Sequence, residues 1–351
     1  MSTTLKIVIP TAGLATRVRP QTWSKPKPLV GVAGRTTLDH LLDTFQSVPD
    51  LSTGALRCPE TAEYIIILGP FLGETQIPHY MEENYPGYNV HYILQSDMRG
   101  QSDALWLARE FLDGPMIMCF SDTLIETDFS FLLKEKTDGI AWVKNVPDPR
   151  RFGVVEVDTD GLVSRLIEKP LTLENNRVAV GCYYFREGRQ LVSAIEEQMK
   201  HKDSLQGEYF LADAINIMVE RGLKIRTQAI DVWLDLGTIE TILETNRYLL
   251  SHGQDNTKSI HRENVRIVPP VFIHESAAIA NSTIGPNASI GADCNITNSR
   301  VEDSILEAGV VMDAAALKNS FIGRQARIQG RSAESTPMVM NIGDNSSIVV
   351  E

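Results

Sequence analysis

The C-terminal part of the chain carries an aliphatic repeat with a step of five or six residues. Apart from one gap of ten residues, the repeat runs through Ile273, Ile279, Ile284, Ile290, Ile296, Val301, Val311, Leu317, Ile322 and Ile328. A helix would need apolar steps of three and four, and an ordinary strand would alternate every two. A six-residue step fits a parallel β-helix in which each flat side turns one aliphatic side chain inward. Irregular loops are the alternative, but chance would not hold this register over so long a stretch.

A different pattern precedes the polar segment at residues 251–259. Short apolar runs alternate there with amphipathic stretches, which is typical of a mostly parallel sheet with helices on both faces. The clearest expected strands are 5–10, 64–68, 90–94, 116–120 and 139–143, and expected helices include 37–45 and 102–111. The predicted fold is a Rossmann-like, doubly wound α/β domain at 1–252, followed by the β-helix at 260–351. Ligands of such sheets lie at the carboxyl ends of the strands.

Composition and charge narrow the class of protein. Of 351 residues, 43% are hydrophobic and 22% are charged, the balance of a globular chain with a sizeable core. The net charge of −12 argues against a protein that follows a nucleic-acid backbone. Neither a membrane-spanning apolar run nor a secretory signal is evident. Four scattered cysteines, Cys58, Cys119, Cys182 and Cys294, fit reduced thiols, so we expect a cytoplasmic protein without membrane or nucleic-acid partners.

The first expected strand runs directly into a loop of small residues. Backbone N–H groups of such a loop can approach phosphate oxygens, and Arg17, Arg19, Lys25 and Lys27 add positive charge in the same region. The loop lacks both the dinucleotide-binding glycine pattern and the Lys-Ser/Thr ending of a P-loop. We therefore predict an anion site, with a plain strand-to-helix turn as the alternative. The site would comprise Ala12, Gly13, Leu14, Ala15, Thr16 and Arg17.

This segment resembles the first motif of the sugar-1-phosphate nucleotidylyltransferases, which make dTDP-glucose, UDP-glucose, ADP-glucose and related nucleotide sugars. The family pattern is Gly-x-Gly-Thr-Arg-Leu, then Pro-x-Thr, then a Lys-Pro-rich turn. The resemblance implies that Arg17 holds the triphosphate and that Lys27 is the catalytic lysine at the α-phosphate. Ala15 stands where the second glycine is usual.

A second matching block spans residues 94–104, a strand end, a turn and a helix start. The resemblance implies that Gln95 reads the edge of the base and that Gly100 lets the base lie close to the backbone, with Ser102 also in the nucleotide site. A carboxamide can match the N3–H and a carbonyl of uracil or thymine. Taken alone, a glutamine at a strand end is usually a solvated cap.

Two aspartates follow apolar runs at widely separated places. Asp122 and Asp235 resemble the family's metal-holding carboxylates, although Ser121 replaces the glycine that commonly precedes the first. Magnesium prefers one or two carboxylates together with phosphate oxygens and water, so two converging aspartates would suffice. An isolated Asp after a strand is more often a turn or helix cap. The family context favours Mg²⁺ as the cofactor.

Further blocks resemble the sugar side of the family's site. The matching residues are Gly153, Glu168 and Gly181 for the sugar, Lys169 for its phosphate, and Glu208, whose block also contains Gly207 and Asp213. Gln206 stands where a sugar-phosphate-binding arginine is common in thymidylyltransferases. The identity of the sugar therefore stays open.

The resemblance covers nearly the whole chain and is greatest to the long-form glucose-1-phosphate thymidylyltransferases, which end in a left-handed β-helix. It implies an enzyme that joins an NTP, dTTP or UTP being favoured, to a sugar-1-phosphate and releases pyrophosphate. One alternative is a regulatory paralogue that binds nucleotide sugars without turnover. Another is a bifunctional enzyme whose β-helix transfers acyl groups with His261 or His274.

The C-terminal repeat also predicts an assembly role. A β-helix of few coils has open ends and a flat surface, so it gains stability by packing against another copy or its own catalytic domain. We expect a homo-oligomer in which residues 260–351 mainly support assembly and regulation. A chain ending near Gly253 should then retain some activity.

Overall fold

A computed structural model describes residues 4–51, 62–201, 207–259 and 264–350. The chain divides into two compact units. Residues 1–14 and 41–233 form the sheet unit, and residues 15–40 and 234–351 form the β-helix unit. The boundary therefore falls inside the predicted phosphate loop. Cys58, Gln206 and His261 lie outside the described residues.

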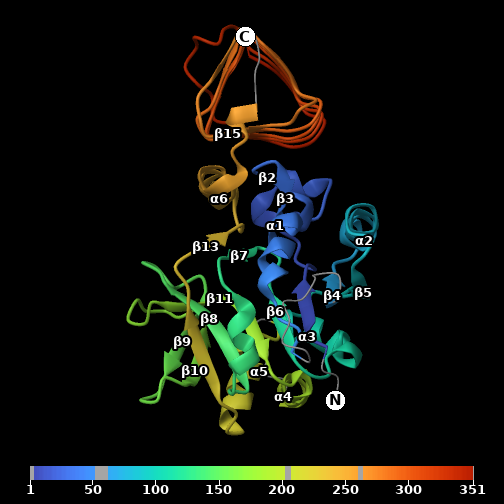
Figure 1. Ribbon diagram of the computed structural model, residues 1–351, viewed down its shortest axis with the longest axis vertical. Coiled ribbons are helices and arrows are strands. Elements are labelled where there is room, and N and C mark those ends of the chain that lie inside the picture. Colours follow the sequence, from blue (N-terminus) through green and yellow to red (C-terminus); the bar gives the residue numbers. More distant parts are fainter. Residues whose placement is uncertain (1–3, 52–61, 202–206, 260–263, 351) are drawn as a thin grey trace. The chain divides into compact units, whose positions relative to one another are not determined.

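The sheet unit is built on one mixed sheet (Figure 1). Its strands are β1 (Lys6–Pro10), β4 (Glu63–Leu68), β5 (Asn89–Leu94), β6 (Met116–Cys119), β8 (Gly139–Asn145), β9 (Gly153–Val157), β10 (Val163–Glu168), β11 (Arg177–Phe185) and β12 (Ile225–Ala229). The main path runs β10-β9-β11-β6-β1-β4-β5. β6, β1, β4 and β5 are parallel. β11 runs antiparallel to β6 and β8, β9 runs antiparallel to β10, and β12 is parallel to β8.

Helices pack around the sheet, and three of them share a core cluster with its central strands. They are α2 (Leu72–Asn84), α3 (Gln101–Leu107), α4 (Gly188–His201) and α5 (Leu211–Glu220), while α1 (Thr37–Thr44) crosses the unit boundary. Leu105 of α3, Leu191 of α4 and Ile215 of α5 are buried in one cluster with Met116 and Met118 of β6. In β4, every residue after Glu63 is buried, as expected of a parallel strand covered on both faces. The five expected strands are confirmed, but the sequence pattern did not distinguish the antiparallel half.

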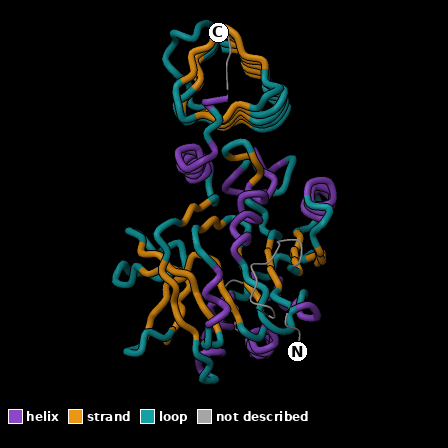
Figure 2. The backbone as a smooth tube through the Cα atoms, viewed as in Figure 1, coloured by secondary structure: helices purple, strands orange, loops and turns teal. Residues whose placement is uncertain are grey.

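The β-helix unit contains three parallel sheets, one on each side of a three-sided coil (Figure 2). The first is β14 (Val265–Ile267), β17 (Ser282–Ile284), β20 (Arg300–Glu302) and β23 (Ala316–Lys318). The second is β15 (Val271–Ile273), β18 (Ala288–Ile290), β21 (Ile305–Leu306), β24 (Phe321–Ile322) and β26 (Asn341–Ile342). The third is β16 (Ala278–Ala280), β19 (Asn295–Thr297), β22 (Val311–Asp313), β25 (Arg327–Gln329) and β27 (Ser347–Val349). The expected β-helix is thus confirmed.

The coil core corrects one position of the aliphatic repeat. Val311 was expected to point inward, but it is 37% exposed, whereas Met312 is fully buried and pairs with Ile296. Leu306, also buried, pairs with Ile290 and fills the apparent gap of ten residues. Methionine and leucine satisfy the inward position as well as isoleucine does because the core requires apolar volume. The repeat is therefore continuous.

Residues 15–40 pack within the β-helix unit through α6 (Ile239–Leu249) and the first coils. This segment also holds the short strands β2 (Gly31–Val32) and β3 (Arg35–Thr36), and β13 (Trp233–Asp235) leads into α6. Asn246, 1% exposed, accepts a hydrogen bond from the Ala33 N–H at 2.9 Å and donates one to the Asn287 carbonyl at 3.1 Å. Gly34 has a φ of 83°, and a Cβ there would meet the Phe272 ring at 2.4 Å. Only glycine satisfies both conditions.

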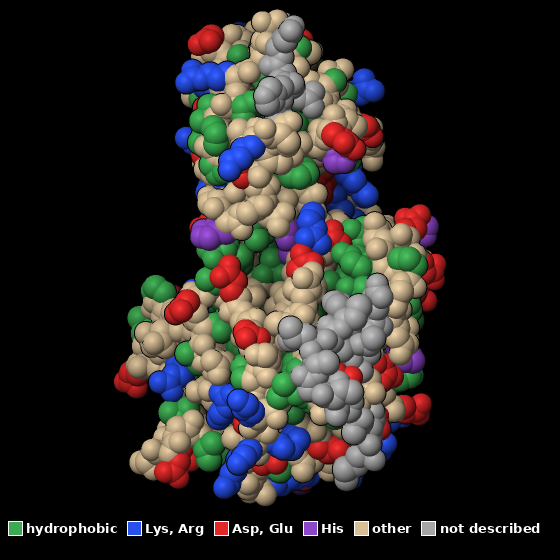
Figure 3. Space-filling view, viewed as in Figure 1, with side chains coloured by type: hydrophobic (Ala, Val, Ile, Leu, Met, Phe, Trp, Pro, Cys, Tyr) green, Lys and Arg blue, Asp and Glu red, His purple; other side chains and the backbone are tan. Residues whose placement is uncertain are grey.

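On the face drawn in Figure 3, acidic and basic side chains are interspersed among polar ones over both units. Of the helices in the described ranges, none is long and apolar enough to cross a bilayer.

Candidate active site

The start of the phosphate loop is held at the centre of the sheet unit. β1 lies between β4 and β6, and both the N–H and the Oγ1 of Thr11 donate to the Ile67 carbonyl, at 2.7 and 2.8 Å. A Cβ on Gly69 would meet the Ala12 carbonyl oxygen at 2.7 Å, so the neighbouring strand end approaches the loop closely. Ala12 is buried, while Gly13 and Leu14 are exposed. The exposed part of the loop thus leaves the carboxyl end of a central strand, as expected.

The rest of the loop belongs to the β-helix unit. Ala15 has a φ of 47° and a ψ of 39°, a left-handed conformation that favours glycine. Its carbonyl accepts hydrogen bonds from the Val18 N–H at 3.0 Å and Thr22 Oγ1 at 2.9 Å. Thr16 and Arg17 are exposed in the 3-10 turn Thr16–Val18. Alanine therefore adopts here the conformation that a glycine would adopt more easily.

Lys27 is half-buried and begins the 3-10 turn Lys27–Leu29. Its carbonyl accepts hydrogen bonds from the Val30 N–H and from Thr37 Oγ1, both at 3.0 Å. The backbone on which this side chain stands is therefore anchored. Arg17 and Lys27 both belong to the β-helix unit.

Lys25 does not add free charge to the phosphate site, which corrects the sequence expectation. Its side chain is 1% exposed, and its ammonium contacts the carboxylate of Glu307 and lies 3.4 Å from Asp344 Oδ1. Two carboxylates of the β-helix therefore neutralise this cation. They lie so far along the chain that no local pattern could reveal them.

The predicted base-reading turn is rigid. Gln95 is 3% exposed, and its Nε2 donates to Asp103 Oδ2 at 2.9 Å and to the Gly100 carbonyl at 3.1 Å. Both amide hydrogens are therefore used inside the protein, and Oε1 is the atom left to match a base. A Cβ on Gly100, whose φ is 100°, would meet the Tyr209 backbone at 2.6 Å. Ser102 is fully buried, and its N–H donates to the Tyr209 carbonyl at 3.1 Å.

Asp122 lies half-buried in the turn between β6 and β7 (Thr123–Ile125). This turn is tied to β11, because the Phe120 N–H donates to the Gly181 carbonyl at 3.0 Å and Thr123 Oγ1 donates to the Val180 carbonyl at 2.8 Å. A Cβ on Gly181, whose φ is 86°, would lie 2.5 Å from the Phe120 ring. The structure therefore brings the predicted metal ligand next to the strand that carries a predicted sugar contact.

Asp235 ends β13 and precedes α6 in the β-helix unit. Its Oδ1 accepts a hydrogen bond from the Gly237 N–H at 2.9 Å, and a Cβ on Gly237 would lie 2.8 Å from the same oxygen. Thr238 caps the helix by accepting from the Thr241 N–H at 3.3 Å, so Asp235 is not its N-cap. The helix-cap alternative is therefore excluded for this aspartate, whereas its hydrogen bond to the N–H two residues further on is the local turn named as the other alternative.

Of the predicted sugar residues, Gly153, Lys169 and Glu208 lie near Glu168 in the sheet unit, whereas Gly181 packs against Phe120. A Cβ on Gly153 would lie 3.1 Å from Glu168 Oε2. Burial raises the pKa of Glu168, the charge of Lys169 lowers it in part, and the nearby Asp213 and Glu208 raise it further. These residues come from separate sequence blocks, so only the fold unites them.

Aromatic residues that the sequence motifs did not single out complete this cluster. Lys169 has a φ of 48°, its N–H donates to the Phe152 carbonyl at 3.0 Å, and its Nζ lies 4.9 Å from the centre of the Phe210 ring. The Trp233 ring packs edge-on against Phe152 with centroids 5.0 Å apart. Burial and the Glu168 charge raise the pKa of Tyr183 well above its ordinary value. Phe152 directly precedes Gly153 and Phe210 lies two residues after Glu208, and this closeness to predicted motif residues is the signal that could have found them.

The carboxylate donors fit magnesium chemically. Within the described ranges, no group of three or more His, Cys, Asp and Glu side chains is arranged to hold a metal alone. Mg²⁺ takes one or two carboxylates and completes its shell with substrate phosphates and water. Asp122 and Asp235, one in each unit, offer hard oxygen donors of this kind.

The sheet unit thus has an exposed loop at the carboxyl end of a central strand, the place where sheets of this kind bind ligands, and a cluster of carboxylates around Glu168. The chain belongs to the nucleotidyl transferase family, whose model matches residues 6–252. A second family model, the GMPPB C-terminal domain, matches residues 267–346.

Individual relatives agree with this family. The glucose-1-phosphate thymidylyltransferase of Streptomyces antibioticus is 28% identical over 99% of this chain and 100% of its own length. The bifunctional protein GlmU of Methanocaldococcus jannaschii is 29% identical over 77% of this chain and 60% of its own. A Bacillus anthracis structure named as a putative glucose-1-phosphate thymidylyltransferase matches with a TM-score of 0.58 and 20% identity, over 70% of this chain and 95% of that one, and supports the fold.

Proposed function

We propose that the protein transfers a nucleoside monophosphate from dTTP or UTP to a sugar-1-phosphate, with glucose-1-phosphate favoured, and releases pyrophosphate. Family membership supports sugar-phosphate nucleotidyl transfer as the reaction class. The observation that carries the proposal is the cluster around Glu168, where predicted sugar-binding residues from separate blocks meet. The full-length similarity to a glucose-1-phosphate thymidylyltransferase favours this substrate pair.

The chemistry requires alignment and charge neutralisation. An oxygen of the sugar-1-phosphate attacks the α-phosphorus in line, and the bond from that phosphorus to the leaving pyrophosphate breaks, with the electron pair remaining on pyrophosphate. The nucleophile is already anionic at neutral pH, so no general base is needed. Lys27 would neutralise the α-phosphate and Arg17 would steady the leaving group. Bound Mg²⁺, held by Asp122 and Asp235, would supply further positive charge to the phosphates.

Because Gln95 Nε2 donates to Asp103 and to the Gly100 carbonyl, the Oε1 atom of Gln95 is the group expected to select the base. This oxygen can accept a hydrogen bond from the N3–H of thymine or uracil, whereas cytosine and adenine present an acceptor at the corresponding position. Guanine has an N–H at its own pairing edge, so rejection of GTP must come from the size of the base. We therefore expect dTTP and UTP to be used better than CTP, ATP and GTP, with a slight preference between the first two.

The rival functions have weaker support. His274, a candidate for acyl transfer, has its Nδ1 2.9 Å from Ser276 Oγ within a local turn. Acetyl-CoA consumption would support the bifunctional alternative. A regulatory paralogue would bind nucleotide sugar without releasing pyrophosphate.

A substrate panel tests the proposal. Pyrophosphate release should be measured with five nucleoside triphosphates, dTTP, UTP, CTP, ATP and GTP, against several sugar-1-phosphates, with the Asp122→Asn variant as the blank. Release with a pyrimidine triphosphate and glucose-1-phosphate is expected. No release with any pair, from a protein that still binds nucleotide sugar, would favour the regulatory paralogue instead.

A further inference from the structure

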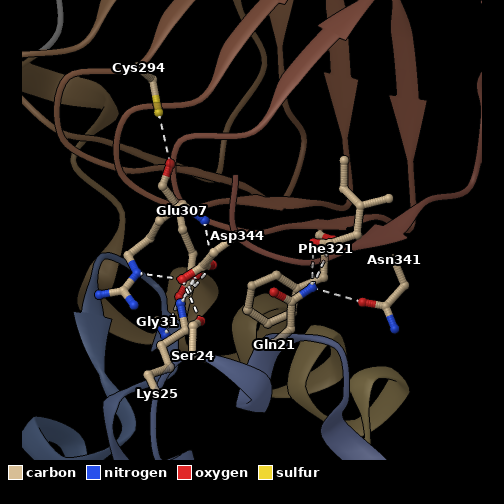
Figure 4. A network of polar contacts seen from close by, with 11 residues as sticks. Gln21, Ser24, Lys25, Gly31, Cys294, Glu307, Phe321, Asn341 and Asp344 are labelled. Carbon is tan, nitrogen blue, oxygen red and sulfur yellow. Dashed lines mark hydrogen bonds and ion pairs between the residues drawn. The ribbon is translucent and has the colours of Figure 1, made fainter. Parts of the chain in front are cut away.

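A buried polar network joins the segment after the phosphate loop to the third and later coils of the β-helix (Figure 4). Lys25 contacts Glu307 and Asp344 of the β-helix. Glu307 Oε1 also accepts a hydrogen bond from the Gly31 N–H at 3.1 Å, and Asp344 Oδ2 accepts one from Ser24 Oγ at 2.7 Å. The same two carboxylates therefore hold the chain on both sides of residues 26–30.

Gln21 makes a second attachment. It is fully buried, and its Nε2 donates to Asn341 Oδ1 at 2.8 Å, to the Ile342 carbonyl at 2.9 Å and to the Phe321 carbonyl at 3.2 Å. Asn341 Nδ2 in turn donates to the Arg19 carbonyl at 3.2 Å. Figure 4 shows Gln21 directed at the strands that carry Phe321 and Asn341.

These attachments lie close in the sequence to the two cations proposed to contact the triphosphate. Arg17 lies two residues before the attachment at Arg19, and Lys27 lies between those at Lys25 and Gly31. Residues 15–29 form short 3-10 turns, which their own hydrogen bonds hold only weakly. The placement of this segment must therefore come largely from its contacts with the coils.

These buried polar contacts are better suited to fixing the position of the segment than to stabilising the fold. Burying a charged group costs solvation that its partner only partly restores, so a buried ion pair is weak evidence for added stability. Burial raises the pKa of Glu307 in spite of the Lys25 charge beside it. Apolar contacts of equal size would hold the segment, but they would tolerate sliding, whereas directional polar contacts specify one register.

We propose that Glu307, Asp344 and Asn341 are positioning residues for the transfer reaction, which set the phosphate-contacting segment through Lys25 and Gln21. The inference rests on the proposed function for its effect on turnover. It makes the β-helix part of the catalytic apparatus and assigns these contacts a task besides assembly.

The test compares Glu307→Gln with Glu302→Gln in the full-length protein. Both variants remove one carboxylate of the β-helix, but the Glu302 carboxylate contacts Arg300 and Lys318 of its own sheet, at 3.6 and 3.5 Å. In Glu307→Gln, hydrogen exchange of amides in residues 16–30 should rise about tenfold or more. Its kcat should fall by about tenfold to a hundredfold, with a smaller change in the KM for the triphosphate, because misalignment acts mainly on the reacting geometry. Glu302→Gln should match the wild type in both measurements.

Several outcomes separate this inference from the proposed function. A folded Glu307→Gln protein with wild-type exchange in residues 16–30 would overturn it, as would faster exchange with unchanged turnover. If Glu307→Gln lacks a cooperative melt, Asn341→Ala, which removes an exposed side chain, should show a smaller change in the same direction, and wild-type behaviour there would overturn it. A wild-type protein without transferase activity would refute the proposed function, while the exchange measurement would still decide whether the attachment exists.

Discussion

At the scale of single residues, Lys25 and Lys27 belong to one sequence motif but differ in role. Lys25 attaches the segment to the β-helix, and Lys27 is the proposed phosphate contact. They are separated only by Pro26, yet Lys25 is buried among carboxylates, while Lys27 is half-buried on an anchored turn. A proline fixes φ and restricts the residue before it, which helps to hold the two side chains in different surroundings. We therefore expect the motif to serve both as a substrate contact and as an attachment.

Removing charge at the proposed metal ligands is the first prediction. Asp122→Asn and Asp235→Asn should each lower turnover by orders of magnitude, because Mg²⁺ loses an anionic donor. In the Asp235→Asn variant the amide oxygen at that position would still accept from the Gly237 N–H, so the fold should remain intact. Pyrophosphate release and thermal melts measure the two effects. Near-wild-type activity in either variant would remove that residue from the metal site.

Lys27→Ala should lower kcat more than it weakens nucleotide binding. Its charge matters most as the α-phosphorus accepts the nucleophile, so the interaction is stronger in the transition state than in the ground state. Steady-state kinetics together with calorimetric binding of the triphosphate separate the two. A change confined to KM would mean that Lys27 only holds the substrate.

The contributions of Glu307 and Asp344, the two carboxylates beside Lys25, to the free energy of unfolding should change with pH in opposite directions. Burial raises the pKa of Glu307 above its ordinary value of 4.5, so its contribution to stability is present below that value and is lost as pH rises through the raised pKa. Burial raises the pKa of Asp344, but the Ser24 hydrogen bond and the Lys25 charge together lower it below 3.8. The contribution of Asp344 to stability is therefore present above pH 3.8 and is lost as pH falls through the lowered pKa.

Urea unfolding over a range of pH measures this difference. Relative to Glu307→Gln, the wild type should lose stability as pH rises above 4.5. Relative to Asp344→Asn, it should lose stability as pH falls below 3.8. Parallel curves for the wild type and Glu307→Gln would show that the Glu307 proton is bound equally in the folded and unfolded states.

At the scale of elements, the coil of the β-helix depends on which neighbouring residue turns inward. Met312 is fully buried against Ile296, while Val311 is 37% exposed. Met312→Ala should therefore destabilise the fold by about 2–5 kcal/mol. Val311→Ala should change the free energy of unfolding by about 1 kcal/mol or less. Denaturant titration of both variants checks this, and equal losses would contradict the inward assignment of Met312.

At the scale of the whole molecule, removal of the residues after Gly253, called the tail, tests both the assembly role and the positioning role of the β-helix. A chain ending after Gly253 loses Glu307, Asp344 and Asn341, so Lys25 and Gln21 lose the side chains that they contact. If the tail serves only assembly, this chain should lose oligomeric mass and keep some activity. The attachment of residues 19–31 leads us to expect a much larger loss of turnover than assembly alone would cause.

Light scattering on both chain lengths, beside the pyrophosphate assay, measures the two roles. We expect the full chain to be a homo-oligomer and the shortened chain to be smaller and less stable. An unchanged oligomeric mass would contradict the assembly role, and turnover near that of the full chain would contradict the positioning role.

Local spacing alone determined much of this protein. The pattern of the apolar residues predicted five of the nine strands of the main sheet and the coil of the β-helix, because a period reflects the geometry of a single element. The residues near Glu168 were singled out by the family resemblance of their blocks, and not by spacing. The predicted strands and the predicted coil required no knowledge of contacts between distant parts of the chain.

Only the tertiary structure decided the partners of those residues. Lys25 meets Glu307 across 282 positions, and Gln21 meets Asn341 across 320. The choice of Met312 over its neighbour Val311 depends on pairing with Ile296 in the preceding coil. A sequence pattern reports which residues share a face, but which side chains meet across elements depends on how the chain packs, since nothing in the local spacing encodes a distant neighbour.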